Sequence, residues 1–220
     1  MARRRILSAL TFYGVLFAVA VAVLFFAGRP FGRDPNPWLG HVSWLSSDWS
    51  RLGLSLVLSA LVSVVVIVGT RVVVRRAHWA RELHSGFREL LGPLTSGEIL
   101  VFALTSGVAE ELFFRAALQP WIGYFAASLV FGLVHIGPGR RFVPWTIWAV
   151  AMGFVLGGIY GLTGHVLGPM LAHVLVNYEN MHFLNGHDPQ AHTPSSEAPP
   201  SGATALVGAR ERGGASRSWH

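Results

Sequence analysis

Long apolar runs constrain the fold of this chain more than any other feature. Residues 6–28 form a continuous apolar run after a basic start, and residues 52–74 form a second one. About 20 apolar residues suffice to cross a bilayer as a helix, whereas the apolar region of a secretory signal is roughly 7–15 residues long. Because 52% of the 220 residues are hydrophobic and only 13% are charged, we expect a polytopic membrane protein.

Turn and capping signals divide the rest of the chain into further helices. A Gly-Pro pair at 92–93 ends a basic segment, and Thr95 with Glu98 has the spacing of a capping box. The sequence therefore predicts an all-α fold, a polytopic membrane helix bundle with about six transmembrane helices and one interfacial helix near 71–91. The expected spans are residues 6–28, 52–74, 96–118, 121–136, 143–162 and 165–184.

The arginines are distributed unequally between the two predicted faces of the membrane. All 17 basic residues are arginine, and 13 of them lie at the N-terminus, in 71–91, in the 140–141 loop or in the C-terminal tail. The opposite side has only Arg29, Arg33 and Arg51. By the positive-inside rule, this predicts a multi-pass protein of a bacterial cytoplasmic (inner) membrane with both termini in the cytoplasm. Membrane topology also explains the positive charge better than binding to nucleic acid does, so we expect no nucleic-acid partner.

Three segments follow from these patterns. Residues 1–92 are expected to hold two transmembrane helices, an external loop and the basic interfacial helix. Residues 93–184 are expected to form a catalytic core of four helices. Residues 185–220 are rich in Pro, Ser, Gly and Ala, which predicts a disordered cytoplasmic tail. The chain has no cysteine, so disulfides and a cysteine nucleophile are excluded.

The third predicted span carries three ionisable residues, Glu110, Glu111 and Arg115. A charge near the bilayer centre costs roughly 3 kcal/mol on insertion scales, so such residues need partners and mark functional sites. Glu111 and Arg115 are four residues apart on a helix and are expected to form an ion pair. Glu110 points to another side and is left free, either as a functional carboxylate or as a protonated group that is only hydrogen-bonded within the bundle.

Later spans supply polar residues at the same four-residue spacing, namely Phe131 with His135 and His173 with Asn177. Taken singly, each is more often a packing residue or interhelical contact. Together with a free Glu110, they can hold and deprotonate a water molecule while a histidine and an asparagine donate to an oxyanion. The set Glu110, His135 and His173 is equally suited to a metal such as zinc.

Other kinds of catalytic site find little support. The chain has no His-Glu-x-x-His, and its aspartates, at 34, 48 and 188, lie outside the predicted spans. Ser106 beside Gly107 lacks the first glycine of a Gly-x-Ser-Gly motif and is interpreted as helix packing. One geometric question stays open: Glu110 lies about 21 Å along its helix, yet His135 is close to the end of the next one. Either strong tilt or a fourth helix that ends below the surface would bring them together.

The motifs Glu-Glu-x-x-x-Arg, Phe-x-x-x-His and His-x-x-x-Asn, in this order on separate helices, resemble the CPBP family of intramembrane proteases. That family includes the CAAX prenyl endopeptidases and the bacterial Abi or bacteriocin-processing proteins, and the resemblance covers about residues 95–184. It implies an all-helical endopeptidase in which Glu110 and His135 activate a water molecule while His173 and Asn177 stabilise the oxyanion. Glu111, Arg115 and Phe131 take supporting positions. No cofactor is required in this mechanism, although zinc at Glu110, His135 and His173 is the alternative.

The resemblance also implies a substrate, which is a membrane-anchored or lipidated protein or peptide cut within the lipid bilayer. A second hypothesis is a non-catalytic member that serves as a membrane scaffold, immunity factor or maturation factor. A proton-coupled transporter built on Glu110 and the histidines is disfavoured, because the spans show no inverted repeat and no Gly/Pro-broken half-helices.

Overall fold

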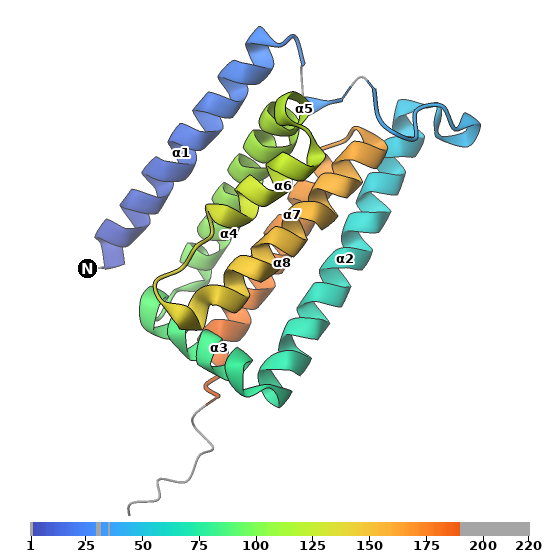
Figure 1. Ribbon diagram of the computed structural model, residues 1–220. Coiled ribbons are helices and arrows are strands. Elements are labelled where there is room, and N and C mark those ends of the chain that lie inside the picture. The colour runs from blue at the N-terminus through green and yellow to red at the C-terminus, as the bar shows by residue number, and fades with distance from the viewer. Residues whose placement is uncertain (1, 30–31, 35, 190–220) are drawn as a thin grey trace, which may run out of the picture. The chain divides into compact units, whose positions relative to one another are not determined.

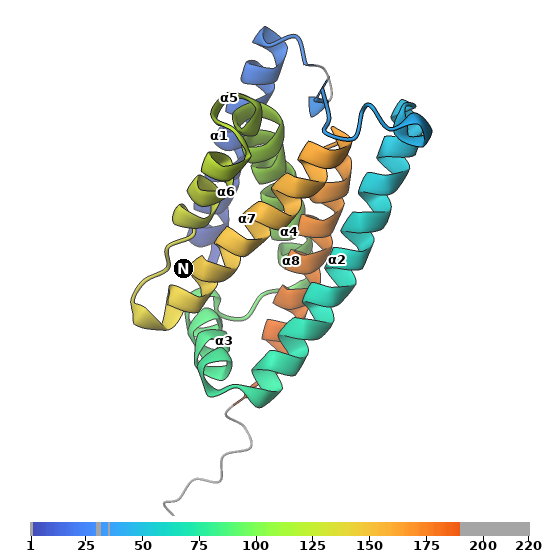
Figure 2. The ribbon, with the colours of Figure 1, turned by 45° about the vertical axis from the view of Figure 1, so that its right-hand side comes forward.

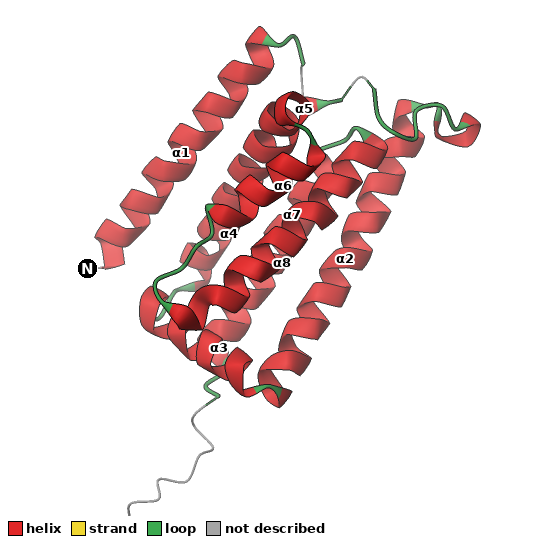
Figure 3. Ribbon diagram, in the orientation of Figure 1, coloured by secondary structure: helices red, strands yellow, loops and turns green. Residues whose placement is uncertain are grey.

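The computed structural model describes residues 2–29, 32–34 and 36–189, and every regular element in those ranges is helical (Figures 1 and 3). The all-α prediction is therefore confirmed. Residues 1–189 form one compact unit, and most of the predicted tail, residues 190–220, lies outside the described residues. The elements are α1 (Ala2–Phe26), η2 (Ser43–Leu45), α2 (Asp48–Arg76), α3 (His78–Leu91), α4 (Ser96–Glu111), the π-helix η3 (Leu112–Leu118), α5 (Gln119–Ile122), α6 (Tyr124–Leu133), η4 (Arg140–Phe142), α7 (Val143–Thr163) and α8 (Leu167–Gly186).

Three segments are long and apolar enough to cross a membrane by length and composition: Ile6–Phe26, Asp48–Arg76 and Arg140–Thr163. The run at 121–136, predicted as one span, is instead broken at Gly123, whose φ of +85° separates α5 from α6. Helix α6 has ten residues, which gives it a length of about 15 Å, half of a hydrocarbon core of about 30 Å. The prediction of a single continuous helix in this stretch is therefore wrong.

Small residues bring the central helices into close contact. Helix α4 packs on α8, and α6 packs on α7 (Figure 2). A Cβ placed on Gly107 would lie 2.6 Å from Cγ2 of Val174, and one on Gly153 would lie 2.6 Å from the backbone oxygen of Ser128. Glycine at an interface lets two helix backbones approach each other, which strengthens packing where no hydrophobic force acts between helices. These contacts fix α4, α6, α7 and α8 around the polar residues described below.

The start of α4 follows the predicted capping box. The Thr95 backbone N–H donates to Glu98 Oε2 at 2.7 Å, and the Glu98 N–H donates to Thr95 Oγ1 at 3.3 Å. Helix α8 extends further than predicted, to Gly186. Near its end, the Asn185 side chain donates to the backbone oxygen of Leu94 at 2.8 Å. The predicted tail boundary at residue 185 therefore moves past the end of α8. That contact joins the end of α8 to the start of α4.

Candidate active site

The acidic motif lies where the backbone changes from an α-helix to a π-helix. Glu110 and Glu111 end α4, and the next seven residues, Leu112–Leu118, form the π-helix η3. Its last turn is closed by the Gln119 N–H, which donates to the backbone oxygen of Phe114, five residues earlier. Short π segments inside α-helices occur frequently at functional sites. The wider turn begins directly after the two carboxylates.

Glu111 is the centre of a fully buried ionic cluster. Its Oε2 accepts from Arg115 Nε at 2.9 Å, and its Oε1 lies 2.8 Å from His173 Nδ1 on α8. Glu111 and Arg115 both have 0% exposed side chains. The predicted Glu111–Arg115 ion pair is thus present, and the contact with His173 is an addition that the sequence did not reveal. A carboxylate beside a guanidinium is an acceptor, so the Nδ1 atom of His173 carries the hydrogen.

Phe131 on α6 lies between the charged residues and the histidines. The Arg115 guanidinium lies 4.4 Å from the centre of the Phe131 ring, a cation–π contact. The same ring lies 4.6 Å from the His135 ring and 6.1 Å from the His173 ring. Two of the guanidinium nitrogens, Nη1 and Nη2, have no hydrogen-bond partner among the described residues. The face of the Phe131 ring therefore partly compensates the positive charge of the buried Arg115, whose Nη1 and Nη2 have no hydrogen-bond acceptor among the described residues.

Glu110 faces a different histidine. Its Oε2 lies 3.3 Å from His135 Nε2, and the Glu110 side chain is 7% exposed. His135 Nδ1 lies 2.6 Å from the backbone oxygen of Phe131, which can only accept, so this nitrogen carries a hydrogen. Neutral His135 then presents a lone pair at Nε2 to the carboxylate. Glu110 and His135 either share one additional proton, or together form two adjacent acceptors.

The position of His135 answers the open geometric question. Helix α6 ends at Leu133, and His135 lies in the turn that follows, where its backbone oxygen accepts from the Thr146 hydroxyl at 3.2 Å. The Trp145 ring on α7 contacts the His135 ring at 5.7 Å. The ten-residue length of α6 agrees with the second alternative, a fourth helix that ends early. Because α6 stops early, the turn after it brings His135 to Glu110.

Asn177 is held one turn of α8 away from His173. Its side-chain nitrogen donates to Ser106 Oγ at 2.9 Å, and Ser106 donates in turn to the backbone oxygen of Phe102 at 2.8 Å. The pairs Ser106–Asn177 and Glu111–His173 run in opposite directions along the two helices, so α4 and α8 are antiparallel here. Ser106 therefore has a hydrogen-bonded packing position, as its interpretation as a packing residue predicts. One of the two amide hydrogens of Asn177 is used by this contact.

One residue near the site was not predicted from the sequence. Tyr13 on α1 has its hydroxyl within hydrogen-bonding reach of the Glu110 carboxylate. A tyrosine in the middle of an apolar span was the available signal, since its hydroxyl needs a partner when it leaves water. Helix α1 packs on α4 and η3. Thus α1 contributes to the surroundings of Glu110.

The residues suggested for a metal do not converge in this structure. Across residues 2–29, 32–34 and 36–189, no group of three or more His, Asp or Glu side chains has the arrangement of a metal site. Glu110 contacts His135, whereas His173 directs Nδ1 to Glu111. The side chains of the proposed zinc set are thus divided between two clusters, and they do not fit a three-ligand zinc site.

Together, the fold and the site define a class: an all-helical membrane protein with two buried acid–histidine pairs on adjacent residues of one helix. Residues 93–178 match the sequence profile of the family described as "Type II CAAX prenyl endopeptidase Rce1-like". This segment, about two fifths of the chain, is therefore similar to that endopeptidase family, as the motifs indicated. All seven predicted site residues, from Glu110 to Asn177, lie inside the matched segment.

A curated relative matches part of the same chain. It is "Uncharacterized protein YpbD" of Bacillus subtilis (strain 168), which is 36% identical over 81 residues. The match covers 36% of this chain and 41% of the relative, so the chain spans about two fifths of that protein's length. No solved structure matches the chain.

Proposed function

We propose that this protein is an intramembrane endopeptidase that hydrolyses a peptide bond in a membrane-anchored or lipidated protein or peptide. The observation that carries the proposal is the contact between Glu110 and His135, 3.3 Å apart and nearly buried. Such a pair can take a proton from water and return it to a leaving amine. The family match over residues 93–178 supports hydrolysis as the reaction.

In the proposed first step, Glu110 and His135 activate the water molecule. When the pair holds no shared proton, Glu110 Oε2 and His135 Nε2 are adjacent acceptors, and one water molecule can donate a hydrogen to each. As the water oxygen attacks the scissile carbonyl carbon, one of its protons passes to the pair. The pair then delivers this proton to the departing amine nitrogen, so the proton count closes without an outside acid. General acid–base catalysis of this kind contributes roughly 10²–10⁴-fold to a rate.

His173 and Asn177 are proposed to stabilise the oxyanion. His173 Nδ1 donates to Glu111, so its Nε2 donates to a substrate only when the ring is an imidazolium. In that form, Glu111 Oε1, 2.8 Å from Nδ1, is the counter-ion of the ring. Asn177 has a second amide hydrogen besides the one given to Ser106. Donors fixed in advance at a developing negative charge are each worth about 10²–10³-fold.

The short helix α6 fits a substrate that is anchored in the membrane. Helix α6 ends after ten residues, and the loop that follows it runs toward the end of the helical unit that holds α3 and the start of α4 (Figure 1). In the proposed topology, with both termini in the cytoplasm, this is the cytoplasmic side. A membrane-anchored peptide would then reach Glu110 from that side. We propose this topology from the arginine distribution and the helix order.

The test is a comparison of the wild type with Glu110→Gln in proteoliposomes. A farnesylated CAAX peptide serves as the first probe, and a comparison of protein termini in membranes from cells that carry either form identifies other substrates. We expect the wild type to cleave at least one of them and Glu110→Gln to be slower by about 10²–10⁴-fold. Glu98→Gln is the matched control, because Glu98 belongs to the capping box at the start of α4, twelve residues before Glu110.

The result also separates an enzyme from a non-catalytic scaffold. A scaffold or immunity factor would retain its partner interaction or its protective effect in the Glu110→Gln variant. If the wild type and this variant release the same protein termini in equal amounts, the proposed reaction is wrong.

A further inference from the structure

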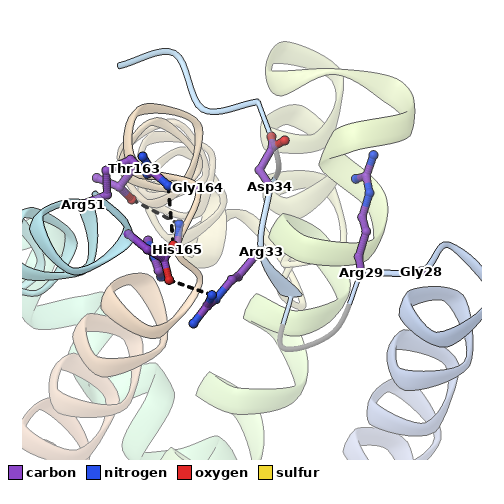
Figure 4. Close-up of a pocket in the computed structure, with 9 residues that line it drawn as sticks. Gly28, Arg29, Arg33, Asp34, Arg51, Thr163, Gly164 and His165 are labelled. Carbon is purple, nitrogen blue, oxygen red and sulfur yellow. Dashed lines mark hydrogen bonds and ion pairs between the residues drawn. The ribbon is translucent and has the colours of Figure 1, made fainter. Parts of the chain in front are cut away.

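A charged pocket lies at the other end of the helices, away from His135. It has a volume of about 270 Å³ and is lined by residues of the loop after α1, the start of α2 and the turn before α8 (Figure 4). Three arginines line it, Arg29, Arg33 and Arg51, together with two aspartates, Asp34 and Asp48. Because three arginines face two aspartates, the lining has a net positive charge even when His165 is neutral. The pocket is thus suited to an anion.

The charges in this pocket are unequally paired. Asp48 is shared, because it lies 2.6 Å from Arg33 Nη1, 3.0 Å from His165 Nε2 and 3.5 Å from Arg51 Nη2. Arg29 is different: its Nη1 atom is buried and has no hydrogen-bond partner among the described residues. Figure 4 shows Arg33 reaching toward the His165 side of the pocket, while Arg29 stands apart from that cluster. A buried guanidinium nitrogen without an acceptor is costly, and a phosphate oxygen is the acceptor that suits it best.

An apolar groove of about 720 Å³ continues from the charged pocket. The two share Gly28, Arg29, Arg33 and His165. The rest of the groove is apolar and comes from four separate elements: α1, α2, η3 and the segment that begins α8. Ligand pockets typically measure roughly 300–1,000 Å³, so the groove can hold an alkyl chain. A positive pocket joined to an apolar groove matches a molecule with an anionic head and a hydrocarbon tail.

Exposed tryptophans place this end of the helices at a membrane surface. Trp44 is 68% exposed, Trp49 is 80% exposed and Trp121 is 70% exposed. Tryptophan is enriched at the head-group level of bilayers, where one part of the ring is apolar and the N–H remains wet. The arginine pocket, formed by the loop before α2 and the turn before α8, lies at this same end. A phospholipid phosphate is therefore expected at the depth of the pocket.

We propose that the pocket and the groove together bind one anionic phospholipid. Arg29, whose buried Nη1 has no partner among the described residues, holds the phosphate, and an acyl chain lies in the groove against Val21, Leu24 and Met170. The groove also includes Leu112, the first residue after Glu111. The bound lipid is therefore part of the wall beside the π-helix. Its head group is at the opposite end from His135, so this lipid is distinct from the peptide substrate.

The test uses the full chain in detergent with added lipid. Phosphatidylglycerol, phosphatidylcholine and inorganic phosphate are titrated separately, and both the melting temperature and the lipid retained in native mass spectrometry are recorded. We expect phosphatidylglycerol to raise the melting temperature and to remain bound as one molecule, since a ligand stabilises the state that binds it. Phosphatidylcholine should bind more weakly, and inorganic phosphate should have no effect at the same concentration.

Two variants of the site and one control complete the experiment. Arg29→Gln removes the unpartnered guanidinium and should weaken phosphatidylglycerol binding by about tenfold. Val21→Trp fills the groove from a partly exposed position on α1 and should abolish retention of the lipid. Arg76→Gln, at the far end of α2, should bind as the wild type does. Equal binding of both lipids by the wild type, or an effect of phosphate alone, would overturn the proposal. Binding of phosphatidylglycerol at the wild-type level by both Arg29→Gln and Val21→Trp would also overturn the proposal.

Discussion

Glu110 and Glu111 are neighbours in the chain but lie in two different environments. Glu111 has no exposed surface and accepts from both Arg115 and His173, at 2.9 and 2.8 Å. Glu110 faces His135 at 3.3 Å, has the Tyr13 hydroxyl nearby, and retains a small exposed fraction. Successive residues on a helix point about 100° apart, so one Glu-Glu pair reaches two different helices. Glu111 contacts α8, and Glu110 contacts the turn after α6.

This difference shows that the Glu-Glu motif contains two carboxylates with different roles. One has a fixed charge, and the other can exchange a proton. A carboxylate held between a guanidinium and an imidazole is compensated on both oxygens and remains an anion. A carboxylate opposite one imidazole can exchange a proton with it, because either group can hold the proton. We infer that Glu111 organises the site and that Glu110 performs the proton transfer. The predictions below change one side of this comparison at a time.

The largest expected effect is loss of the fixed charge in Glu111→Gln. This change leaves Arg115 buried without a carboxylate, and breaking a buried ion pair costs about 3–5 kcal/mol of unfolding free energy. Activity should fall as well, since the glutamine amide has one acceptor oxygen where Glu111 gives one each to Arg115 and His173, and it carries no charge to balance an imidazolium. Stability is measured by thermal unfolding in detergent, beside Glu110→Gln, which should unfold close to the wild-type temperature.

A double variant separates the two roles of Glu111. Glu111→Leu combined with Arg115→Met removes both charges, which is often neutral for stability when the volumes are similar. We expect thermal stability to recover in the double variant and activity to stay lost. Recovery of activity along with stability would show that the contact between Glu111 and His173 is not needed for the reaction.

The next effect concerns the proposed oxyanion donors. Asn177→Ala should reduce kcat by about 10²–10³-fold while KM changes little, because the contact forms only in the transition state. Ser106→Ala removes the partner of Asn177 but leaves its amide in place, so its loss of kcat should be smaller. Equal losses in both variants would mean that Asn177 acts through its hydrogen bond to Ser106 and not as an oxyanion donor.

Much of this arrangement follows from the sequence, and the exceptions have physical causes. The start of α4 was predicted by Thr95 and Glu98, since capping is local chemistry between residues close in the chain. The ion pair of Glu111 with Arg115 is equally local. The contact between Glu111 and His173 joins residues 62 positions apart, and no pattern of spacing within one helix reveals which face of a second helix it meets.

Two features of the backbone were also not predicted from the sequence. The π-helix after Glu111 was not predicted, because apolar periodicity does not distinguish a short π segment from the α-helix around it. The short length of α6 was also missed: the helix begins only after Gly123, which was a visible break, and it ends at Leu133. Hydropathy counts apolar residues and extends a helix through any apolar run, whether or not the backbone turns. These two departures are what bring the acidic pair and His135 together.

A smaller effect is expected from Gly107→Ala, which lies between the two environments on α4. A new Cβ would meet Val174 on α8 at 2.6 Å from its Cγ2 and 3.0 Å from its backbone nitrogen. Because the backbone atom cannot move aside, overpacking should cost about 1–3 kcal/mol of unfolding free energy. Both contacts between α4 and α8 should weaken together. Gly97→Ala, where nothing lies within 4 Å, is the control and should leave the melting temperature unchanged.

The smallest effect tests a third acid–histidine pair, between the first residue of α2 and the turn before α8. His165 Nε2 lies 3.0 Å from Asp48 Oδ1 in the turn before α8. Burial lowers the pKa of His165 below its ordinary value of 6.5; Arg33 and Arg51 act in the same direction, and Asp48 opposes them. The unfolded chain therefore takes up the proton first as the pH falls. His165 contributes stability above about pH 6.5 that is lost progressively below it.

His165→Asn should consequently flatten the fall in melting temperature between about pH 7 and pH 5. The change is only partial, because burial also lowers the pKa of His84 on α3, and this second histidine continues to destabilise the fold in acid. The matched experiment is His84→Asn, which should remove the other part. An unchanged pH profile in His165→Asn would mean that Asp48 and the arginines keep the folded and unfolded pKa values of His165 equal. The His165–Asp48 and His135–Glu110 pairs would then share a carboxylate partner and differ only in their depth of burial.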